Sequence, residues 1–338
     1  MNRRSPFDRI PERDWNDWQW QQAHRIRDLA ELSLSVELTD EEVEALDTSA
    51  DVFAFATTPY YTSLIDPEDP NCPVRRQAIP SLAELNVLDS ELEDPLAEDT
   101  HMPVPNLTHR YPDRALLYAS HNCPVYCRHC NRKRKVADPK SAPSRGELDE
   151  AIAYVQATPS IRDVLVSGGD PLSLSDSRLD DVLTRLRAIP HLEIIRLATR
   201  TPVTLPQRIT EALAERLADA GCVLSNQMVL LKGINDRADV VRELNHWLLR
   251  HRCRPYYIFQ ADAVQGTSHF RTPVETGVQI VESLRGWTSG LAVPHYVVDL
   301  PHGGGKVSLQ ADFLQGRDGR MLDFRNYRGE RFDYEEGF

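Results

Sequence analysis

The chain has 338 residues, 41% of them hydrophobic and 27% charged, an ordinary globular composition that excludes a largely disordered protein. Its formal net charge of −12 offers no positive field to a phosphate backbone, which argues against a nucleic-acid partner. The first residues lack the apolar stretch of a secretory signal, and no window approaches the roughly 18 apolar residues of a membrane span, so we expect a cytoplasmic protein without a membrane partner.

Residues 1–105 are predicted to form an N-terminal helical cap and an extended connection. Three tryptophans between residues 15 and 20 have a spacing that favours one helical packing face. Thr39–Glu42 and Ser81–Glu84 are capping boxes, which predict the start of two short helices. The proline-rich stretch 94–105 predicts extended backbone.

From Arg114 onward, short β-rich runs alternate with amphipathic helices, which predicts an α/β fold with parallel strands and right-handed crossovers. The predicted strands are Ala115–Ser120, Asp163–Ser167, Glu193–Thr199, Cys222–Leu231, Arg254–Gln260 and Pro294–Leu300. The predicted helices follow the capping box Ser144–Glu147 or span Leu179–Ile189, Asp236–His251 and Val274–Trp287. The tail 307–338 predicts a β-hairpin around Arg317–Arg320.

The loop after the first of these strands contains Cys123, Cys127 and Cys130. In a parallel α/β barrel the loops after the strands share one face, where active sites form. The C-x3-C-x2-C spacing supplies three thiolates, whereas a closed zinc site takes four ligands. An iron–sulfur cluster held by three cysteines leaves one iron open to a small molecule, so the spacing predicts an enzyme.

Two other loops carry candidate ligand-binding residues. Ser167–Asp170, with the sequence Ser-Gly-Gly-Asp, follows the second strand; glycine admits a ligand close to the backbone, and a carboxylate suits an ammonium group. Lys306 follows three consecutive glycines after the sixth strand, and it does not have the P-loop spacing. A lysine in this setting can form a Schiff base with pyridoxal phosphate (PLP). On spacing alone, a flexible surface loop is an equal alternative.

With Tyr126 before its second cysteine, the cysteine motif resembles that of the radical S-adenosylmethionine superfamily. The resemblance implies a [4Fe–4S] cluster on the three cysteines, S-adenosylmethionine on the open iron, and a flavodoxin- or ferredoxin-like electron donor. It also implies a partial (β/α) barrel of the radical S-adenosylmethionine type with about six parallel strands. That barrel would occupy residues 106–306, between the cap at 1–105 and the tail at 307–338.

A longer set of motifs, in order over most of residues 14–310, resembles the lysine 2,3-aminomutase family. They are Trp15–Trp20, Glu93–Leu96, Thr108–Arg114, Cys127–Cys130, Ser167–Asp170, Arg200–Val203, Asn226–Gln227, Arg254–Ile258, His269–Val274 and Val298–Lys306. The resemblance implies an isomerase that moves the α-amino group of L-lysine to C3, giving β-lysine, with PLP as a third cofactor.

The same resemblance implies roles for individual residues. They are Cys123, Cys127 and Cys130 on the cluster; Ser167, Gly168, Gly169, Asp170 and Gln227 on S-adenosylmethionine; Lys306 as the PLP lysine, with Asp94, Arg110, Tyr111 and Arg114 in the PLP pocket; and Arg132 on the substrate carboxylate, with Asp262 and Asp299 on the distal ammonium. Two carboxylates suit a cationic side chain and would repel that of glutamate. The alternative is that these are ordinary acids paired with local arginines.

The stretch between Pro202 and Asn226 is shorter than the family pattern, by roughly the 30 residues of one βα unit. Two alternatives therefore stay open: an aminomutase for arginine or a carrier-bound lysine-like substrate, and a protein that binds the cluster and PLP without turnover. The chain ends at Phe338 without the cysteine-bearing extension that some relatives use for assembly, so we expect either an oligomer or a monomer. Cys222 and Cys253 fall in apolar runs and are predicted to be buried structural thiols.

Overall fold

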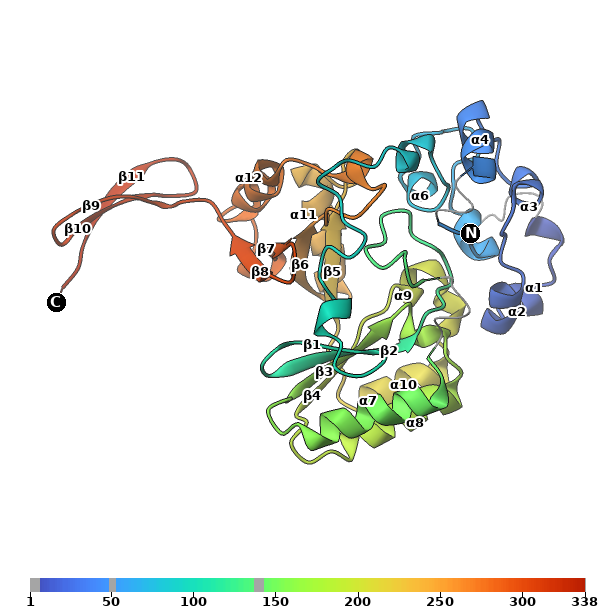
Figure 1. Ribbon diagram of the computed structural model, residues 1–338. Helices are drawn as coiled ribbons and strands as arrows, with labels where there is room; N and C mark the ends of the chain where they lie inside the picture. The colour runs from blue at the N-terminus through green and yellow to red at the C-terminus, as the bar shows by residue number, and fades with distance from the viewer. Residues whose placement is uncertain (1–6, 49–52, 137–142, 338) are drawn as a thin grey trace. The chain divides into compact units, whose positions relative to one another are not determined.

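The computed structural model describes residues 7–48, 53–136 and 143–337, which form two compact units (Figure 1). Unit 1 comprises residues 1–220 together with 264–268, and unit 2 comprises residues 221–263 together with 269–338. Each unit has its own sheet and its own hydrophobic core. None of the helices in the described part of the chain has the length and apolar character needed to cross a membrane.

The N-terminal part of unit 1 is helical, as predicted, and it consists of short helices. They are η1 (Phe7–Arg9), α1 (Glu12–Trp15), α2 (Trp18–Ala23), α3 (Leu29–Ser33), α4 (Asp40–Thr48), α5 (Pro59–Thr62), α6 (Pro73–Arg76), η2 (Leu82–Leu85) and η3 (Asp99–His101). Both predicted capping boxes are confirmed. Thr39 and Glu42 exchange side-chain and backbone hydrogen bonds at the start of α4, and Ser81 and Glu84 do so at η2.

Only one of the three tryptophans between residues 15 and 20 lies in the core, so the prediction of one shared packing face is wrong. Trp15 is buried, whereas Trp18 and Trp20 are half-buried. The helix is not continuous: α1 ends at Trp15, and the side chain of Asp17 caps the start of α2. Because the chain turns at this break, the helical spacing that would align the three rings is lost.

The sheet of unit 1 has the strand order β1-β2-β3-β4. Strands β2, β3 and β4 are parallel, and β1 pairs antiparallel with β2. The strands are β1 (Leu107–Tyr111), β2 (Arg114–Ser120), β3 (Asp163–Gly168) and β4 (Ile194–Leu197), and the helices that follow them are α7 (Arg145–Ala157), η5 (Pro171–Ser173), α8 (Asp176–Arg187), α9 (Thr201–Thr204), η6 (Pro206–Arg208) and α10 (Glu211–Asp219). In Figure 1, α7, α8 and α10 lie together on one face of this sheet.

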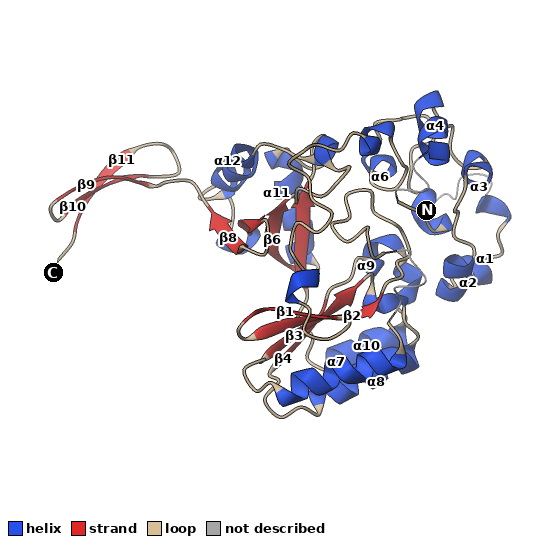
Figure 2. Cartoon of the chain, viewed as in Figure 1, coloured by secondary structure: helices blue, strands red, loops and turns tan. Residues whose placement is uncertain are grey.

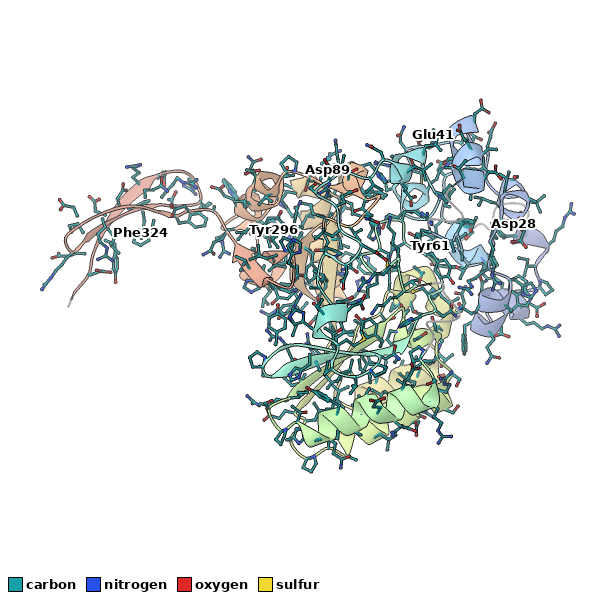
Figure 3. The ribbon with its side chains drawn as sticks, in the orientation of Figure 1. Asp28, Glu41, Tyr61, Asp89, Tyr296 and Phe324 are labelled. Atoms are coloured by element: carbon teal, nitrogen blue, oxygen red, sulfur yellow. The ribbon has the colours of Figure 1, made fainter. Side chains whose placement is uncertain are left out.

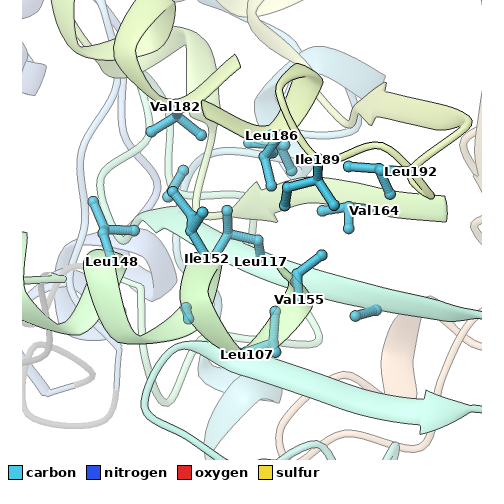
Figure 4. Packing of buried hydrophobic residues seen from close by; sticks show 14 of the residues in the cluster. Leu107, Leu117, Leu148, Ile152, Val155, Val164, Val182, Leu186, Ile189 and Leu192 are labelled. Carbon is cyan, nitrogen blue, oxygen red and sulfur yellow. The ribbon is translucent and has the colours of Figure 1, made fainter. Parts of the chain in front are cut away.

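The core of unit 1 lies between the sheet and these helices (Figure 4). Leu117 and Val164 point from the strands toward Ile152 and Val155 of α7 and Leu186 of α8, and each of these side chains is at most 5% exposed. Burying a side chain of this size contributes about 1.5–3 kcal/mol to the free energy of folding. This core holds the ends of β2 and β3, from which the cysteine loop and the Ser-Gly-Gly-Asp segment start.

The sheet of unit 2 has the strand order β5-β6-β7-β8, with β5, β6 and β7 parallel and β8 antiparallel to β7. The elements are β5 (Ser225–Leu230), α11 (Ala238–Arg250), β6 (Arg254–Gln260), η7 (Ser268–Phe270, which begins in unit 1), α12 (Val274–Leu284), η8 (Gly290–Ala292), β7 (His295–Leu300) and β8 (Gly305–Leu309). Tyr296, labelled in Figure 3, is fully buried between β7 and the helices, together with Leu230, Val241 and Leu284.

The C-terminal segment is a three-stranded antiparallel sheet, β9 (Leu314–Asp318), β10 (Met321–Arg325) and β11 (Arg331–Glu335), as Figure 2 shows. The predicted hairpin is confirmed as β9–β10, but the prediction of a single hairpin is wrong. A second tight turn follows, in which the Asn326 side chain accepts hydrogen bonds from the backbone nitrogens of Arg328 and Glu330. Most of these residues are exposed, and Phe324 is labelled in Figure 3.

All six predicted parallel strands are confirmed, but they form two sheets of three parallel strands each. The division falls between Ala220 and Gly221, inside the stretch that the sequence predicts to be shorter than the family pattern. Between β4 and β5 the described residues form helices and turns and no strand. Strands β4 and β5 are therefore each at the edge of their own sheet.

The edge position of β5 explains why one cysteine prediction is wrong. Cys222 is exposed, Cys253 is half-buried, and the neighbouring Val223 and Leu224 are 86% and 60% exposed. Strand β5 starts only at Ser225, so the apolar run before it has no strand beside it to cover it. The apolar residues 222–224 are typical of a strand inside a sheet. Because β5 is at the edge of its sheet, these side chains are exposed to solvent.

Candidate functional site

The three clustered cysteines lie in the loop that follows β2, and all three are half-buried free thiols. Burial and the nearby charges of Asp170 and Cys130 raise the pKa of Cys123. Burial and the charge of Cys127 raise the pKa of Cys130 to about 11. Thiols such as Cys123 and Cys130, whose ionisation burial and nearby charge disfavour, are suited to a positively charged iron centre, because metal binding removes that cost. The residues present therefore fit an iron–sulfur cluster.

The N-terminal helical region holds this loop in place. The backbone nitrogen of Tyr126 donates to Ala56, and that of Arg128 donates to Gln77. The Arg128 side chain forms a bidentate ion pair with Glu84, with distances of 2.7 and 2.8 Å, and both side chains are at most 1% exposed. The sequence analysis did not predict this pair. The signal that could have indicated it is the position of Arg128 inside the cysteine motif, where a charged side chain needs a partner once it is buried.

Arg200, at the start of α9, contacts the cysteine loop directly. Its Nη1 donates a hydrogen bond to the Sγ of Cys127. Its Nη2 lies 2.6 Å from the Oε1 of Gln77 and 3.3 Å from the hydroxyl of Tyr61, which Figure 3 labels. The backbone nitrogen of Arg200 donates to Asp170 at 2.8 Å. One residue therefore joins the cysteine loop to the segment after β3.

The Ser-Gly-Gly-Asp segment packs tightly against the backbone that leads to Cys123. Gly168 has φ +108°, and a Cβ on it would lie 2.2 Å from the carbonyl oxygen of Ser120. A Cβ on Gly169 would lie 2.6 Å from the carbonyl oxygen of Asn122. Glycine is required here for close packing of two backbone segments, in addition to any role toward a ligand.

The Asp170 carboxylate is fully occupied by protein donors. One oxygen accepts hydrogen bonds from the hydroxyl of Thr199 and the backbone nitrogen of Leu172, at 2.7 and 2.9 Å. The other accepts from the backbone nitrogens of Arg200 and Thr201, at 2.8 and 3.0 Å. A carboxylate has about four lone-pair sites. In this structure the Asp170 carboxylate therefore fixes the two loop ends, and its binding of an ammonium group stays a prediction.

Arg132 and its basic neighbours are paired with acids from residues 94–99. Arg132 forms a bidentate pair with Glu98 at 2.8 and 3.1 Å, and its Nη1 lies 3.5 Å from the Oγ of Ser167. Burial opposes ionisation of Glu98, but the Arg132 guanidinium holds its pKa below the usual value. Asp94 pairs with Arg134 at 3.0 Å. Arg132, predicted to bind the substrate carboxylate, thus keeps one nitrogen directed toward Ser167, whereas Asp94, predicted for the PLP pocket, is paired with Arg134.

Arg110, Tyr111 and Arg114 lie together on the β1–β2 hairpin, as their predicted shared role requires. The two guanidinium carbons lie 4.9 and 4.2 Å from the Tyr111 ring centroid. The Arg110 Nη1 donates to the carbonyl of Leu96 at 3.0 Å. Two guanidinium groups beside one phenol are suited to a phosphate group.

In unit 2, Lys306 pairs with Asp299. Its Nζ lies 2.8 Å from the Oδ2 of Asp299, whose side chain is only 6% exposed, and 4.4 Å from the Phe259 ring centroid. Residues 301–304 form the turn between β7 and β8, and Asp299 and Lys306 are directly opposite each other on those strands. Cross-strand partners point to the same face of a sheet, which brings the two groups together.

The other two predicted residues of unit 2 lie on or beside its parallel strands. Gln227 is an exposed residue of β5. Asp262 follows the end of β6 and is half-buried. Across the described part of the chain, no three His, Cys, Asp or Glu side chains gather closely enough to hold a single metal ion.

Two family models match the chain. One, described as the radical SAM superfamily, matches residues 117–257, and the other, described as lysine-2,3-aminomutase, matches residues 281–337. An L-lysine 2,3-aminomutase of Clostridium subterminale is 45% identical over 366 residues, covering 99% of this chain and 88% of that protein. The L-lysine 2,3-aminomutase of Fusobacterium nucleatum is 44% identical, with 99% and 85% covered.

The chain belongs to the lysine 2,3-aminomutase family. The family also includes a protein named glutamate 2,3-aminomutase, from Clostridioides difficile, which is 40% identical and covers 96% of this chain and 84% of that protein. Membership makes the chain a radical-type isomerase whose cofactors are a [4Fe–4S] cluster, S-adenosylmethionine and PLP. The Clostridium subterminale alignment spans 366 positions against the 338 residues of this chain, so that lysine 2,3-aminomutase has residues with no counterpart here.

Proposed function

We propose that this chain is a radical aminomutase that converts L-lysine to β-lysine by moving the α-amino group to C3. The observation that carries the choice of substrate is the Asp299–Lys306 pair. The buried Asp299 carboxylate holds an alkylammonium group at 2.8 Å, beside aromatic side chains. The distal ammonium of lysine has the same chemistry as the Lys306 side chain. A glutamate side chain would bring a second negative charge to Asp299.

The chain's own residues divide the binding of substrate and cofactors among them. Arg132 would bind the substrate carboxylate through the nitrogen that is not paired with Glu98, and Asp299 with Asp262 would hold the distal ammonium. Arg110, Arg114 and Tyr111 would hold the phosphate of PLP, and Lys306 would hold its aldehyde carbon. When bound, the cluster with S-adenosylmethionine supplies one-electron radical chemistry, and PLP supplies an extended π-system. The cysteine loop, the backbone around Gly168 and Gly169, and Gln227 would hold those first two groups, and Asp94 would keep Arg134 in place beside Arg132.

The proposal includes the arrangement that brings these residues together: a partial (β/α) barrel to which the three parallel strands of each sheet contribute. The domains would be the helical cap at 1–105, the barrel at 106–306 and the tail at 307–338. We propose a cytoplasmic protein that takes electrons from a flavodoxin- or ferredoxin-like donor. The family relationship and the order of the six parallel strands support this arrangement.

The test is anaerobic reconstitution of the full chain with iron, sulfide, PLP and S-adenosylmethionine, followed by incubation with L-lysine, L-arginine or L-glutamate under a low-potential reductant. We expect β-lysine from lysine and no β-amino acid from glutamate. Asp299→Asn should lower kcat/KM for lysine at least tenfold. Product from glutamate alone, or equal lysine kinetics in Asp299→Asn, would contradict the assignment.

The second candidate is a protein that binds the cofactors without turnover. The observation that favours it is that the described residues between β4 and β5 contain no strand. A missing strand narrows a barrel and displaces the later strands. Cleavage of S-adenosylmethionine under reductant distinguishes the two candidates, because both should bind PLP. A visible absorbance band of bound PLP that is lost in Lys306→Ala, together with no cleavage of S-adenosylmethionine under reductant, would support the second.

A further inference from the structure

Arg200 is not among the residues proposed to bind the substrate or PLP, yet its guanidinium lies against a cysteine of the proposed cluster site. We propose that Arg200 is a positioning residue that raises the reduction potential of the cluster by donating a charged hydrogen bond to the Sγ of Cys127. The proposal rests on cluster binding by the cysteine loop and is independent of which amino acid is the substrate.

Two acceptors hold the Nη2 of the Arg200 guanidinium, and its Nη1 donates to the sulfur. Nη2 is held by the Oε1 of Gln77 at 2.6 Å and by the hydroxyl of Tyr61 at 3.3 Å. The Gln77 amide is itself oriented, because its Nε2 donates to the carbonyl of Pro73 at 2.9 Å. The main chain of Arg200 is anchored to Asp170. An N–H group held this way needs no rearrangement to reach the cysteine, which is the condition for a strong directional bond.

The charge of Arg200 is also unlike that of the other arginines near the loop. Arg128 and Arg132 each have a bidentate carboxylate partner. In the described residues, the hydrogen-bond acceptors around the Arg200 guanidinium are an amide, a phenol and a cysteine sulfur, and none of them is a carboxylate. Arg25 also approaches the loop, but its Nη1 donates to two oxygen atoms, the Oδ1 of Asn122 and the carbonyl of Cys123, rather than to a sulfur. Arg200 is therefore the arginine that directs an unbalanced positive charge at a ligating sulfur.

This arrangement has a definite effect on reduction. One electron enters the cluster from an external low-potential donor; the bond between iron and Cys127 stays intact, and Arg200 keeps its proton. The added negative charge spreads onto the thiolates, so a nearby cation and an N–H···S bond stabilise the reduced form more than the oxidised form. Hydrogen bonds to sulfur and net charge are among the factors that set cluster potentials. Removing the guanidinium should therefore make the cluster harder to reduce.

The experiment is a redox titration of the anaerobically reconstituted full chain, followed by electron paramagnetic resonance and visible absorbance, without S-adenosylmethionine or substrate. Arg200→Gln should lower the reduction equilibrium constant about tenfold, equivalent to 59 mV for a one-electron couple. Arg200→Lys keeps the charge with a single donor group, so it should lie between Arg200→Gln and the unaltered chain. Iron and sulfide contents are measured for every variant.

The matched control is Arg208→Gln. Arg208 is a fully buried arginine on η6 whose donors go to the carbonyls of Leu172 and Leu174 and to Asp176, with no contact to a cysteine. Its loss should reduce stability without moving the potential. Where Arg200→Gln retains no cluster, Arg200→Lys supplies the titration. An unchanged or raised potential in the variant that is titrated would overturn the proposal. Because no substrate is present, a failed aminomutase assay would leave this result intact.

Discussion

At the scale of single residues, buried arginines organise unit 1. Arg75 and Arg128 are each at most 1% exposed, and each meets a glutamate through two nitrogens. A buried charge is tolerated only when its partner and further acceptors are in place. Arg128 also donates to the carbonyls of Ala54 and Phe53, so it joins the cysteine loop to the N-terminal region.

This leads to a stability prediction for Glu84→Gln. The variant leaves the Arg128 guanidinium buried without its counter-charge, so we expect the free energy of unfolding to fall by about 3–5 kcal/mol. Urea unfolding of the cofactor-free chain measures it. The matched control is Glu193→Gln, since Glu193 pairs with Arg162 at the surface, where both side chains are more than half exposed. That substitution should cause no measurable change, and equal losses in the two variants would contradict the prediction.

At the scale of elements, an ion pair joins α4 to α6. Glu42 on α4 accepts from the Nε and Nη2 of Arg75 on α6, at 2.8 and 2.6 Å. Burial of Glu42 opposes its ionisation, but the hydrogen bonds and charge of Arg75 outweigh that cost, and the pKa of Glu42 is held below its ordinary value of 4.5. The same carboxylate closes the capping box with Thr39.

The lowered pKa fixes the direction of a pH effect. A carboxyl whose pKa is lower in the folded state contributes stability above its unfolded pKa and loses it as the pH falls toward the folded pKa. The stability difference between the unaltered chain and Glu42→Gln should therefore be constant near neutral pH and shrink below about pH 4.5. Urea unfolding at a series of pH values measures it. A difference that grows as the pH falls would show that the sign is wrong.

Local sequence signals predicted the elements well where the signal was itself local. The capping boxes at Thr39, Ser81 and Ser144 start helices, because a cap depends on four neighbouring residues. The tryptophan spacing failed, because one capping residue, Asp17, interrupts the helix on which that spacing depends. The tail prediction missed β8 and β11, although each of them pairs with the strand just before it through a short turn.

At the scale of the whole molecule, the six parallel strands divide into two units with separate cores. The division falls in the stretch predicted to be shorter than the family pattern, and among the described residues no strand lies between β4 and β5. Small single domains usually unfold in one cooperative step, whereas chains with more than one domain depart from it. The separate cores thus predict a loss of cooperativity.

We therefore expect the cofactor-free chain to unfold in more than one step. Differential scanning calorimetry should give a calorimetric enthalpy larger than the van't Hoff enthalpy. Reconstitution with the cluster, PLP and S-adenosylmethionine, which bind residues of both units in the proposed enzyme, should bring the two enthalpies closer together. A ratio of one in the cofactor-free chain would contradict the prediction.

The sequence by itself was enough to single out the three cysteines, the Ser-Gly-Gly-Asp segment and Lys306 as candidate site residues and to predict the six parallel strands. Spacing, composition and turn residues are properties of short stretches of chain. Only the tertiary structure decided how those residues are used. It assigned the Asp170 carboxylate to four protein donors, placed Lys306 opposite Asp299, and brought Arg200 to the sulfur of Cys127. The contacts of Asp170 with Thr199 and Arg200, and of Arg200 with Cys127, join residues far apart in the sequence, so local pattern carries no record of them.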